Sequence, residues 1–321
     1  MRIVFLGTPE FAVSSLDILV TNGYDICGVV TVPDKPAGRG QQVQQSAVKK
    51  YAESKGLKVL QPSNLKDAAW LEELRSLHAD LFIVVAFRML PEAVWQMPPF
   101  GTFNLHASLL PDYRGAAPIN WAIMNGEKET GVTTFFLQHE IDTGAIIYNE
   151  KVKIEETDTA GRLHDKLKET GAALVLKTVQ TIESGSCPRT PQETIAGAQI
   201  VGAQRHTAPK LNKQLCRINW HKYADEVYNL IRGLSPYPAA WSEIKTSETT
   251  TISVKIFTSS KDHISPLGKA GRIFTDRKTF LKVHVPDGCI DILELQPAGK
   301  NKMSIKDFLN GYKPEEDWIF V

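Results

Sequence analysis

The segment Asn104-Leu105-His106-Ala107-Ser108 places an amide, an imidazole and a hydroxyl at alternate positions. In a β-strand alternate side chains share one face, so Asn104, His106 and Ser108 are expected to project together. An amide donor beside an imidazole at a strand end can stabilise an oxyanion and transfer a proton. A buried histidine that is simply hydrogen-bonded in the core fits the same spacing, so both interpretations stay open here.

A carboxylate that could act with this pair is Asp142, in the turn Glu140-Ile141-Asp142-Thr143-Gly144. The turn follows the apolar run 132–137, and from there an aspartate could reach a histidine on a neighbouring segment. Turns also select aspartate because its side chain hydrogen-bonds the local backbone. A purely structural Asp142 is therefore the alternative.

Motifs of several other enzyme classes are missing. Gly7-Thr8-Pro9-Glu10 lacks the three glycines of a dinucleotide-binding fingerprint, and His139-Glu140 lacks the second helical histidine of a zinc protease. There is no P-loop, no Gly-x-Ser-x-Gly elbow and no evident Cys/His pair. These features argue against an oxidoreductase, an ATPase and a serine hydrolase.

The elements that must position these residues alternate between strand and helix. Strands are expected at 2–6, 26–32, 58–60, 81–85, 102–106, 132–137 and 145–154, and helices at 11–20, 43–55, 65–77, 118–124 and 158–184. The alternation predicts an α/β fold with a mostly parallel sheet and helices on both of its faces. Ligands of such sheets bind beyond the carboxyl ends of the strands.

Hydrophobic periodicity fades between about 184 and 213, which is typical of a linker. Beyond it we expect a helix at 224–232 and short strands at 240–245, 252–257, 271–274, 280–285 and 290–296. Short strands at close spacing predict a small β-barrel. The expected division is a catalytic domain at 1–186, a linker at 187–208 and a C-terminal domain at 209–321.

The composition is that of a globular chain, since 42% of the 321 residues are hydrophobic and 23% are charged. No apolar run approaches the ~18 residues of a membrane span, and the opening run is too short for a signal peptide, so we expect a cytoplasmic protein without a membrane partner. Residues 201–321 hold 18 Lys and Arg against 13 Asp and Glu, although the whole chain carries only +1. This basic part favours a polyanionic partner, with a solvated basic surface as the alternative.

Longer stretches of the sequence resemble one enzyme family from end to end. They are FLGTPEFA at 5–12, PDKPAGRG at 33–40, NLHASLLPDYRGAAPI at 104–119, EIDTG at 140–144 and RGLSPYPAAW at 232–241. In this order they are similar to the methionyl-tRNA formyltransferase family, and the similarity runs through essentially the whole chain.

The resemblance implies a Rossmann-like formyltransferase sheet followed by a small OB-like β-barrel that binds tRNA. It implies formyl transfer from 10-formyltetrahydrofolate to the α-amino group of methionyl initiator tRNA, in support of translation initiation, without a metal or nicotinamide cofactor. The family's Asn/His/Asp catalytic set falls on Asn104, His106 and Asp142. Its folate-lining Ser-Leu-Leu-Pro segment falls on Ser108, Leu109, Leu110 and Pro111.

The same resemblance implies residues on the acceptor side. The loop at 34–40 would take part in tRNA recognition through Lys35 and Arg39, with a plain solvated loop as the alternative. Phe11 either helps to form a methionine pocket or belongs to the core. Lys210 and Lys213 are candidate phosphate contacts, which would position a tRNA without reading its sequence.

Two alternatives to a tRNA-formylating enzyme are compatible with these motifs. A relative that formylates a sugar-nucleotide amine could use the same catalytic set and carry a similar C-terminal domain. A noncatalytic tRNA-binding protein could retain the fold. The sequence also departs from the family's common pattern at 87–91, where Phe-Arg-Met-Leu-Pro stands in place of a Tyr-Gly segment and could alter the folate pocket.

Overall fold

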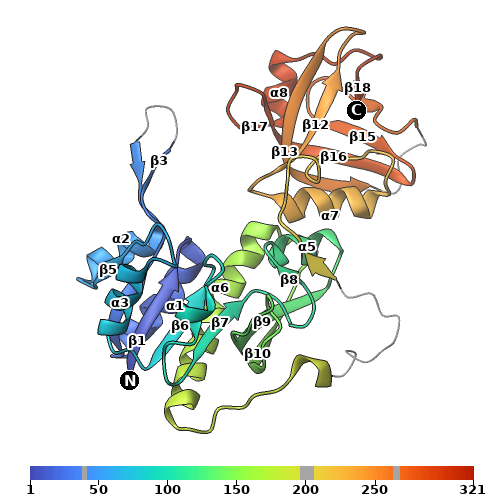
Figure 1. The fold of residues 1–321 in the computed structure, drawn as a ribbon. Coiled ribbons are helices and arrows are strands. Elements are labelled where there is room, and N and C mark those ends of the chain that lie inside the picture. The colour runs from blue at the N-terminus through green and yellow to red at the C-terminus, as the bar shows by residue number, and fades with distance from the viewer. Residues whose placement is uncertain (38–41, 196–205, 263–267) are drawn as a thin grey trace. The chain divides into compact units, whose positions relative to one another are not determined.

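The computed structural model of the chain describes residues 1–37, 42–195, 206–262 and 268–321 (Figure 1). The chain forms two compact units. The first unit comprises 1–115, 129–153 and 164–207, and the second comprises 116–128, 154–163 and 208–321. The two units therefore interleave along the chain, because two short segments of its first half pack with the C-terminal part.

The first unit is built on a seven-stranded sheet with the order β10-β9-β7-β6-β1-β2-β5. Neighbouring strands from β5 to β7 are parallel, whereas β9 and β10 form an antiparallel hairpin at the other edge. The mostly parallel sheet is thereby confirmed. The strand bounds are β1 Arg2–Gly7, β2 Asp25–Val30, β5 Val59–Leu60, β6 Leu81–Val85, β7 Thr102–His106, β9 Glu129–Phe136 and β10 Ile146–Lys153.

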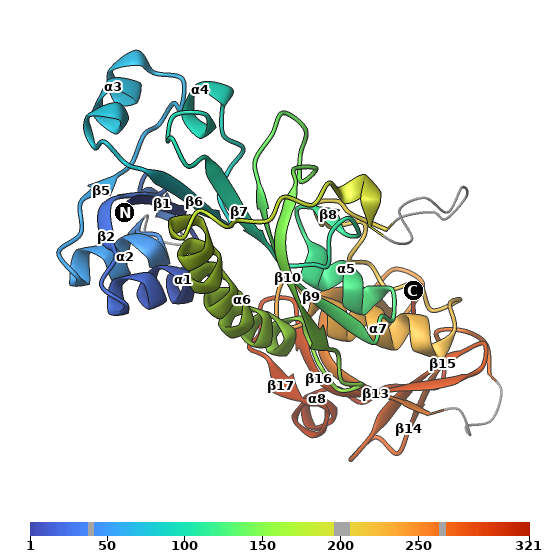
Figure 2. The same cartoon turned by 90° about the horizontal axis from the view of Figure 1, so that it is seen from below.

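Helices cover both faces of this sheet, as expected (Figure 2). Their bounds are α1 Glu10–Thr21, α2 Ala47–Ser54, α3 Ala68–Ser76, α4 Glu92–Trp95 and α6 Ala160–Glu183. Val4 and Phe82 of the central strands pack in one cluster with Leu74 of α3 and Val94 of α4. Full burial of each such side chain stabilises the fold by about 1.5–3 kcal/mol. The opposite face is covered by α1 and α6.

A short hairpin follows β2 in the first unit. It pairs β3 (Lys35–Ala37) with β4 (Gln42–Gln44), and it projects from the sheet in Figure 1. The helix expected over 43–55 therefore begins later, at Ala47, where the hydroxyl of Ser46 accepts the N–H of Lys49 at 3.0 Å. The first residues of the expected helix pair with β3 as strand β4, so their apolar spacing does not lead to a helix.

The second unit is a small antiparallel barrel with the strand order β14-β15-β16-β13-β12-β18, to which β17 adds beside β16. The two ends of this order approach each other, because Phe320 donates to the carbonyl of Gly271 at 2.8 Å and nearly closes the barrel. The expected barrel is confirmed. Its elements are β12 Ala240–Lys245, β13 Thr251–Asp262, β14 Ile273–Thr275, β15 Leu281–Val285, β16 Gly288–Pro297, β17 Met303–Ser304, β18 Ile319–Phe320, α5 Pro118–Met124, α7 Ala224–Leu234 and α8 Ile305–Gly311.

The segment 154–163 is hydrogen-bonded to helix α7 of the second unit through Arg232. This buried guanidinium donates to the carbonyl of Asp158 at 3.1 Å and to Oδ1 of Asn229 at 2.8 Å. Burial lowers the pKa of Arg232. These contacts explain why a segment from the first half of the chain belongs to the second unit. None of the helices in the described ranges has the length and hydrophobicity needed to cross a membrane.

Closure of the barrel gives a stability prediction at Gly271. Its φ is +83°, and a Cβ there would lie 2.2 Å from the carbonyl oxygen of Phe320. Gly271→Ala is expected to cost more than the ~1–3 kcal/mol typical of a strained backbone residue, because the closing hydrogen bond is also displaced. Urea denaturation, followed through the unfolding transition of the barrel, measures this loss in the free energy of unfolding. Gly299→Ala is the matched control, because its φ of +75° is similar and no atom lies within 4 Å of the added Cβ. Equal losses from both substitutions would contradict the closure argument.

Candidate active site

Strand β7 carries Asn104 and His106 two residues apart, and therefore on one face of the sheet. Leu105 points to the opposite face, where its side chain would meet a Cβ on Gly171 of α6 at 2.7 Å. The half-buried side-chain amide of Asn104 has no hydrogen-bond partner among the described residues. This amide is thus available to a ligand at the carboxyl end of β7.

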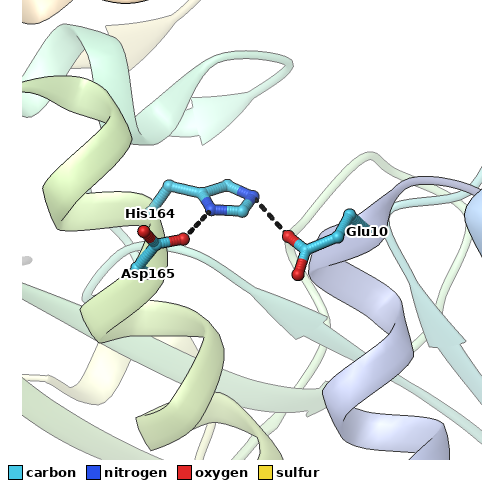
Figure 3. Close-up of side chains that lie close together, drawn as sticks. All are labelled: Glu10, His164 and Asp165. Carbon is cyan, nitrogen blue, oxygen red and sulfur yellow. Dashed lines mark hydrogen bonds and ion pairs between the residues drawn. The ribbon is translucent and has the colours of Figure 1, made fainter.

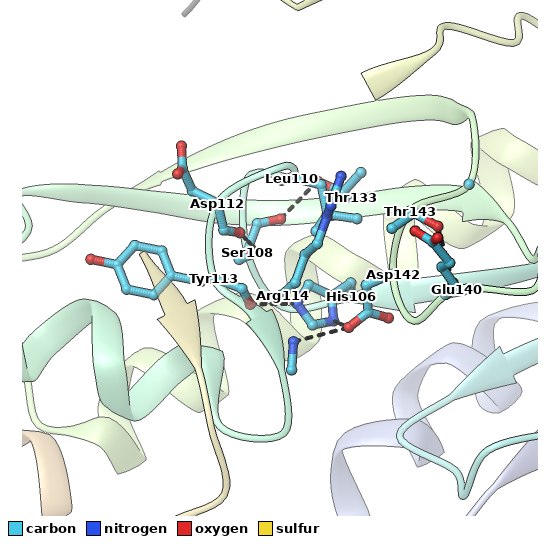
Figure 4. Close-up of polar contacts among 12 residues, drawn as sticks. His106, Ser108, Leu110, Asp112, Tyr113, Arg114, Thr133, Glu140, Asp142 and Thr143 are labelled. Atoms are coloured by element: carbon cyan, nitrogen blue, oxygen red, sulfur yellow. Dashed lines mark hydrogen bonds and ion pairs between the residues drawn. The ribbon is translucent and has the colours of Figure 1, made fainter. Parts of the chain in front are cut away.

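The ring of His106 is only 6% exposed and is held from two sides (Figure 4). Its Nε2 lies 2.9 Å from the carbonyl oxygen of Tyr113. Because a carbonyl oxygen can only accept, we assign a hydrogen to Nε2, and Nδ1 is then the nitrogen that gains or loses a proton. Nδ1 lies 3.8 Å from Oδ2 of Asp142.

Asp142 reaches this site from the loop between β9 and β10. Its Oδ2 accepts the N–H of Gly115 at 3.0 Å. The turn is closed by other groups, because the hydroxyl of Thr143 donates to the carbonyl of Glu140 at 3.1 Å (Figure 4). The carboxylate of Asp142 is therefore directed out of its own turn, toward the end of β7.

The backbone of this loop is tightly constrained. Asp142 has a φ of +55°, which is uncommon for a residue other than glycine. A Cβ on Gly144 would lie 1.6 Å from the carbonyl oxygen of Phe136, so only glycine fits where the loop returns beside β9. The position of the carboxylate therefore depends on the contacts that maintain this backbone conformation.

The segment 108–111 follows β7 directly, but it is largely packed inside the first unit. The Ser108 hydroxyl donates to the carbonyl of Asp112 at 2.7 Å, and the hydroxyl of Thr133 donates to the carbonyl of Ser108 at 2.7 Å. Leu110 is buried against Phe135 and Ile146. β7 ends at His106, so Ser108 does not share the strand face predicted for it. Ser108, Leu110 and Pro111 are buried, and Leu109 is the half-buried member of the segment. That these residues line a folate site stays a prediction.

The loop proposed for tRNA recognition is the β3–β4 hairpin. Lys35 is exposed at its start, while Arg39 lies outside the described residues. The base is anchored by an ion pair of 2.5 Å between Nζ of Lys49 and Oδ2 of Asp34. The hydrogen bond from Lys49 lowers the pKa of Asp34, aided by a second bond from Gln61. The hairpin therefore has a firm base with a basic residue beside it.

The other two candidate tRNA contacts, Lys210 and Lys213, are exposed on the barrel unit. Nζ of Lys213 lies 5.0 Å from the ring centroid of Trp241, and the guanidinium carbon of Arg217 lies 5.1 Å from it. The indole N–H also donates to the carbonyl of Lys213 at 2.7 Å. This arrangement gives the barrel a cationic surface around an aromatic ring, a combination suited to nucleic acid.

Phe11, at the start of α1, is 7% exposed and packs edge-on against His164 of α6 at 5.3 Å between ring centroids. Next to it, Glu10, His164 and Asp165 bring their polar atoms close enough to hold a metal ion (Figure 3). Nζ of Lys168, however, already bonds Oε1 of Glu10 at 2.7 Å. An ammonium group on the carboxylate makes this an ion-pair network with an unfavourable charge for a cation. Whether Phe11 borders a methionine pocket stays a prediction.

The departure at 87–91 does not direct its charge into the site. The guanidinium of Arg88 donates to the carbonyls of Ser63 and Pro62. Met89 beside it is 68% exposed, which leaves an apolar side chain open in the loop that follows β6.

Several residues that hold the site were not identified from the sequence. Tyr113 and Gly115 act through backbone groups, which carry no signal in side-chain patterns. Gln192 lies in the stretch interpreted as a linker, yet it is buried against the Asp142 loop.

The barrel unit contains a Cys/His contact that the sequence did not indicate. Sγ of Cys289 lies 3.4 Å from Nδ1 of His284. Both residues are buried, and burial lowers the pKa of His284.

Comparison with known proteins matches the chain to two family models. Residues 1–179 match the formyl transferase family, and residues 210–313 match the formyl transferase C-terminal domain. A methionyl-tRNA formyltransferase of Phocaeicola vulgatus is 54% identical over 99% of this chain and 97% of its own length. One of Bacteroides fragilis strain YCH46 is 52% identical over 97% of this chain and 95% of its own length.

Solved structures share the fold at lower identity. An N-formyltransferase of Helicobacter canadensis, in complex with folinic acid and dTDP-3-aminofucose, is similar with a TM-score of 0.66. It is 22% identical, and the match covers 94% of this chain and all of that one. HypX of Aquifex aeolicus in complex with tetrahydrofolic acid gives a TM-score of 0.65 at 20% identity, over 98% of this chain and 48% of that one. At these identities the likeness concerns the fold alone.

Proposed function

The chain belongs to the methionyl-tRNA formyltransferase family, and from this we propose that it transfers the formyl group of 10-formyltetrahydrofolate to the α-amino group of methionyl initiator tRNA. The identity of more than half over nearly the full length carries the proposal. The pairing of His106 with Asp142 at the carboxyl end of β7 supports it, because this is the edge where ligands of parallel sheets bind. The acceptor would be a charged tRNA, so the reaction belongs in the cytoplasm.

The reaction requires stabilisation of a developing negative charge. A neutral amine attacks the formyl carbon, and its carbonyl oxygen becomes an oxyanion. The Asn104 amide, which no described residue engages, donates a hydrogen bond to this oxygen. A preorganised donor of this kind contributes about 3–4 kcal/mol to the transition state.

The reaction also requires the amine to lose a proton and the leaving nitrogen of the folate to gain one. His106 exchanges a proton at Nδ1, because its Nε2 hydrogen is held by Tyr113. Asp142 stabilises the protonated imidazole from 3.8 Å. A positioned acid–base group commonly contributes about 10²–10⁴-fold to the rate.

The proposal has the folate co-substrate bind beside these three residues. The segment 108–111 forms the wall that follows β7, and Ile141, 60% exposed next to Asp142, offers an apolar surface to a planar ring. Folate-bound relatives of the same fold support a folate site of this kind. The transfer involves no change of oxidation state, so the proposal contains no redox cofactor.

Both units contribute basic side chains to the tRNA. The exposed candidates are Lys35 of the β3–β4 hairpin and Lys210 and Lys213 of the second unit. Arg39, outside the described residues, is assigned from the sequence alone. These are phosphate contacts, which position the acceptor without reading its sequence. Trp241, which packs against the barrel core, lies beside Lys213 and Arg217 and so gathers two cations at one point of this surface.

The proposed tRNA acceptor predicts a steep dependence on salt. The kcat/KM for methionyl-tRNA is expected to fall linearly with salt on logarithmic axes, because each neutralised phosphate releases a counterion. Replacing both Lys210 and Lys213 with alanine is expected to reduce the slope of log kcat/KM against log salt by about 2, which is about 1 for each lost phosphate contact. Steady-state kinetics between low and moderate salt measure both quantities.

The matched control removes two lysines that already have carboxylate partners. Lys58 pairs with Glu73 at 3.2 Å and Lys151 pairs with Glu129 at 2.7 Å. The double alanine variant at these positions has the same change of charge and is expected to keep the parent slope. A salt-insensitive rate in the parent, or equal slopes in both double variants, would contradict the assigned tRNA contacts.

A further inference from the structure

Gln192 is a buried amide that bonds the loop carrying Asp142 with its nitrogen and Arg114 with its oxygen. It is 2% exposed, and its Nε2 donates to the carbonyl of Asp142 at 2.8 Å and to that of Gly144 at 2.9 Å. Its Oε1 accepts Nε of Arg114 at 3.2 Å and also a second guanidinium hydrogen. Only one orientation of the amide satisfies all of these partners, so its donor and acceptor ends are determined by the network.

The other end of this network is the segment 113–115, which touches each member of the catalytic pair. The carbonyl of Tyr113 accepts from the ring of His106, and the N–H of Gly115 donates to the carboxylate of Asp142. Its middle residue, Arg114, donates to Gln192. Gln192 therefore ties together the two segments whose spacing sets the distance between imidazole and carboxylate.

The backbone of Asp142 needs such support. A residue other than glycine with positive φ costs on the order of 1–3 kcal/mol and persists when surrounding contacts over-determine it. The bonds from Gln192 fall on the carbonyls on either side of Thr143, one of which belongs to Asp142 itself. They hold the peptide that aims the carboxylate at His106.

Gln192 is itself firmly placed. Two residues earlier, Thr190 exchanges backbone hydrogen bonds with Ile146 of β10, at 2.8 and 2.9 Å. The guanidinium carbon of Arg189 lies 4.2 Å from the ring centroid of Phe136. The segment 189–192 is thus docked on the β9–β10 edge of the first unit and brings Gln192 to the loop from a rigid base.

We infer that Gln192 is a positioning residue for formyl transfer, acting through Asp142. This inference rests on the proposed function. Loss of its two N–H donors lets the Asp142 peptide turn, and the carboxylate then leaves its place beside Nδ1 of His106. A misplacement of about 1 Å can reduce a rate on the order of 100-fold.

The test compares Gln192→Met with the parent in formyl transfer to methionyl-tRNA. We expect kcat to fall by about 10- to 100-fold while KM for tRNA and for folate changes by less than about 2-fold. Gln192→Glu serves as a second variant, because it keeps the side-chain length and the acceptor for Arg114 but has no N–H donors; it is expected to lose kcat as well. Gln296→Met is the control for the substitution, because Gln296 also donates to a backbone carbonyl, that of Lys300 at 2.8 Å, but does so in the barrel unit.

A double-variant cycle separates positioning from a general structural role. If Gln192 acts through Asp142, then Gln192→Met in an Asp142→Asn background lowers kcat by less than about 2-fold further. Additive losses, or a Gln192→Met enzyme as fast as the parent, would overturn the inference. A parent chain that transfers no formyl group would instead contradict the proposed function.

Discussion

Replacing His106 with alanine is expected to lower kcat for formyl transfer by about 10²–10⁴-fold, the usual contribution of a positioned acid–base group. Nδ1 of the imidazole lies 3.8 Å from the carboxylate of Asp142. In the proposed mechanism, removal of the imidazole takes away the group that exchanges a proton with the amine. Single-turnover kinetics at saturating substrate measure the chemical step, and equilibrium binding measures affinity for tRNA separately.

Affinity for tRNA is expected to change little in this variant, because His106 is buried and the proposed phosphate contacts are elsewhere. His139→Ala is the matched control, since that histidine is exposed, pairs with Glu92 at 3.2 Å and packs edge-on against Trp95 at 5.6 Å between ring centroids. A parent that binds tRNA but transfers no formyl group would favour a noncatalytic binder. An active His106→Ala variant would contradict the role of the imidazole.

Replacing Asn104 with alanine is expected to lower kcat by about 10²–10³-fold, the loss seen when one oxyanion donor is removed. The side-chain amide makes no bond to the rest of the described chain, so its removal leaves no protein group unpaired. The variant is therefore expected to keep the parent's melting temperature. This combination of a large kinetic loss and unchanged stability distinguishes a ligand-directed amide from a structural one.

Asn104→Asp sharpens this test. Aspartate has nearly the same shape as asparagine, but its carboxylate cannot donate and repels a developing oxyanion. We expect Asn104→Asp to be at least as slow as Asn104→Ala. An aspartate variant with near-parent kcat would show that Asn104 does not serve as the donor. Asn149→Ala, at an exposed position of β10, is the control for substitution of asparagine.

Local patterns in the sequence were sufficient for much of the sheet. The continuous apolar run of β6 and the alternation in β7 predicted the bounds Leu81–Val85 and Thr102–His106 that the structure has. Both strands lie in the middle of the sheet and are buried along nearly their whole length, as expected of strands that are covered on both faces. The predicted placement of Asn104 and His106 on one face follows from the same period.

Short and non-local elements could not be predicted in this way. Helix α8 was missed although Ser304 caps it by accepting the N–H of Asp307 at 3.2 Å, because seven residues give too little periodicity. Strand β13 was expected at 252–257 but runs from Thr251 to Asp262, since its second half is defined by pairing with β16. Such pairing depends on residues far along the chain.

The candidate site likewise combines residues that local patterns indicate with residues that only long-range contacts bring together. Asp142 could be suggested from its turn, but its approach to His106 depends on how β9 pairs with β7 and where the loop returns. Gln192 had no pattern to mark it, because a single buried amide in a stretch without periodicity resembles any polar linker residue. Its role follows only from the carbonyls and the guanidinium that surround it.

The most direct test of the account is an acceptor assay with 10-formyltetrahydrofolate labelled in its formyl group. Methionyl initiator tRNA and a dTDP-linked amino sugar are offered to the parent chain in parallel, with His106→Ala as the inactive reference. We predict label on the tRNA, recovered as N-formylmethionine after hydrolysis of the ester, and little or none on the sugar nucleotide. Faster labelling of the sugar nucleotide, or transfer to tRNA that survives loss of His106, would contradict it.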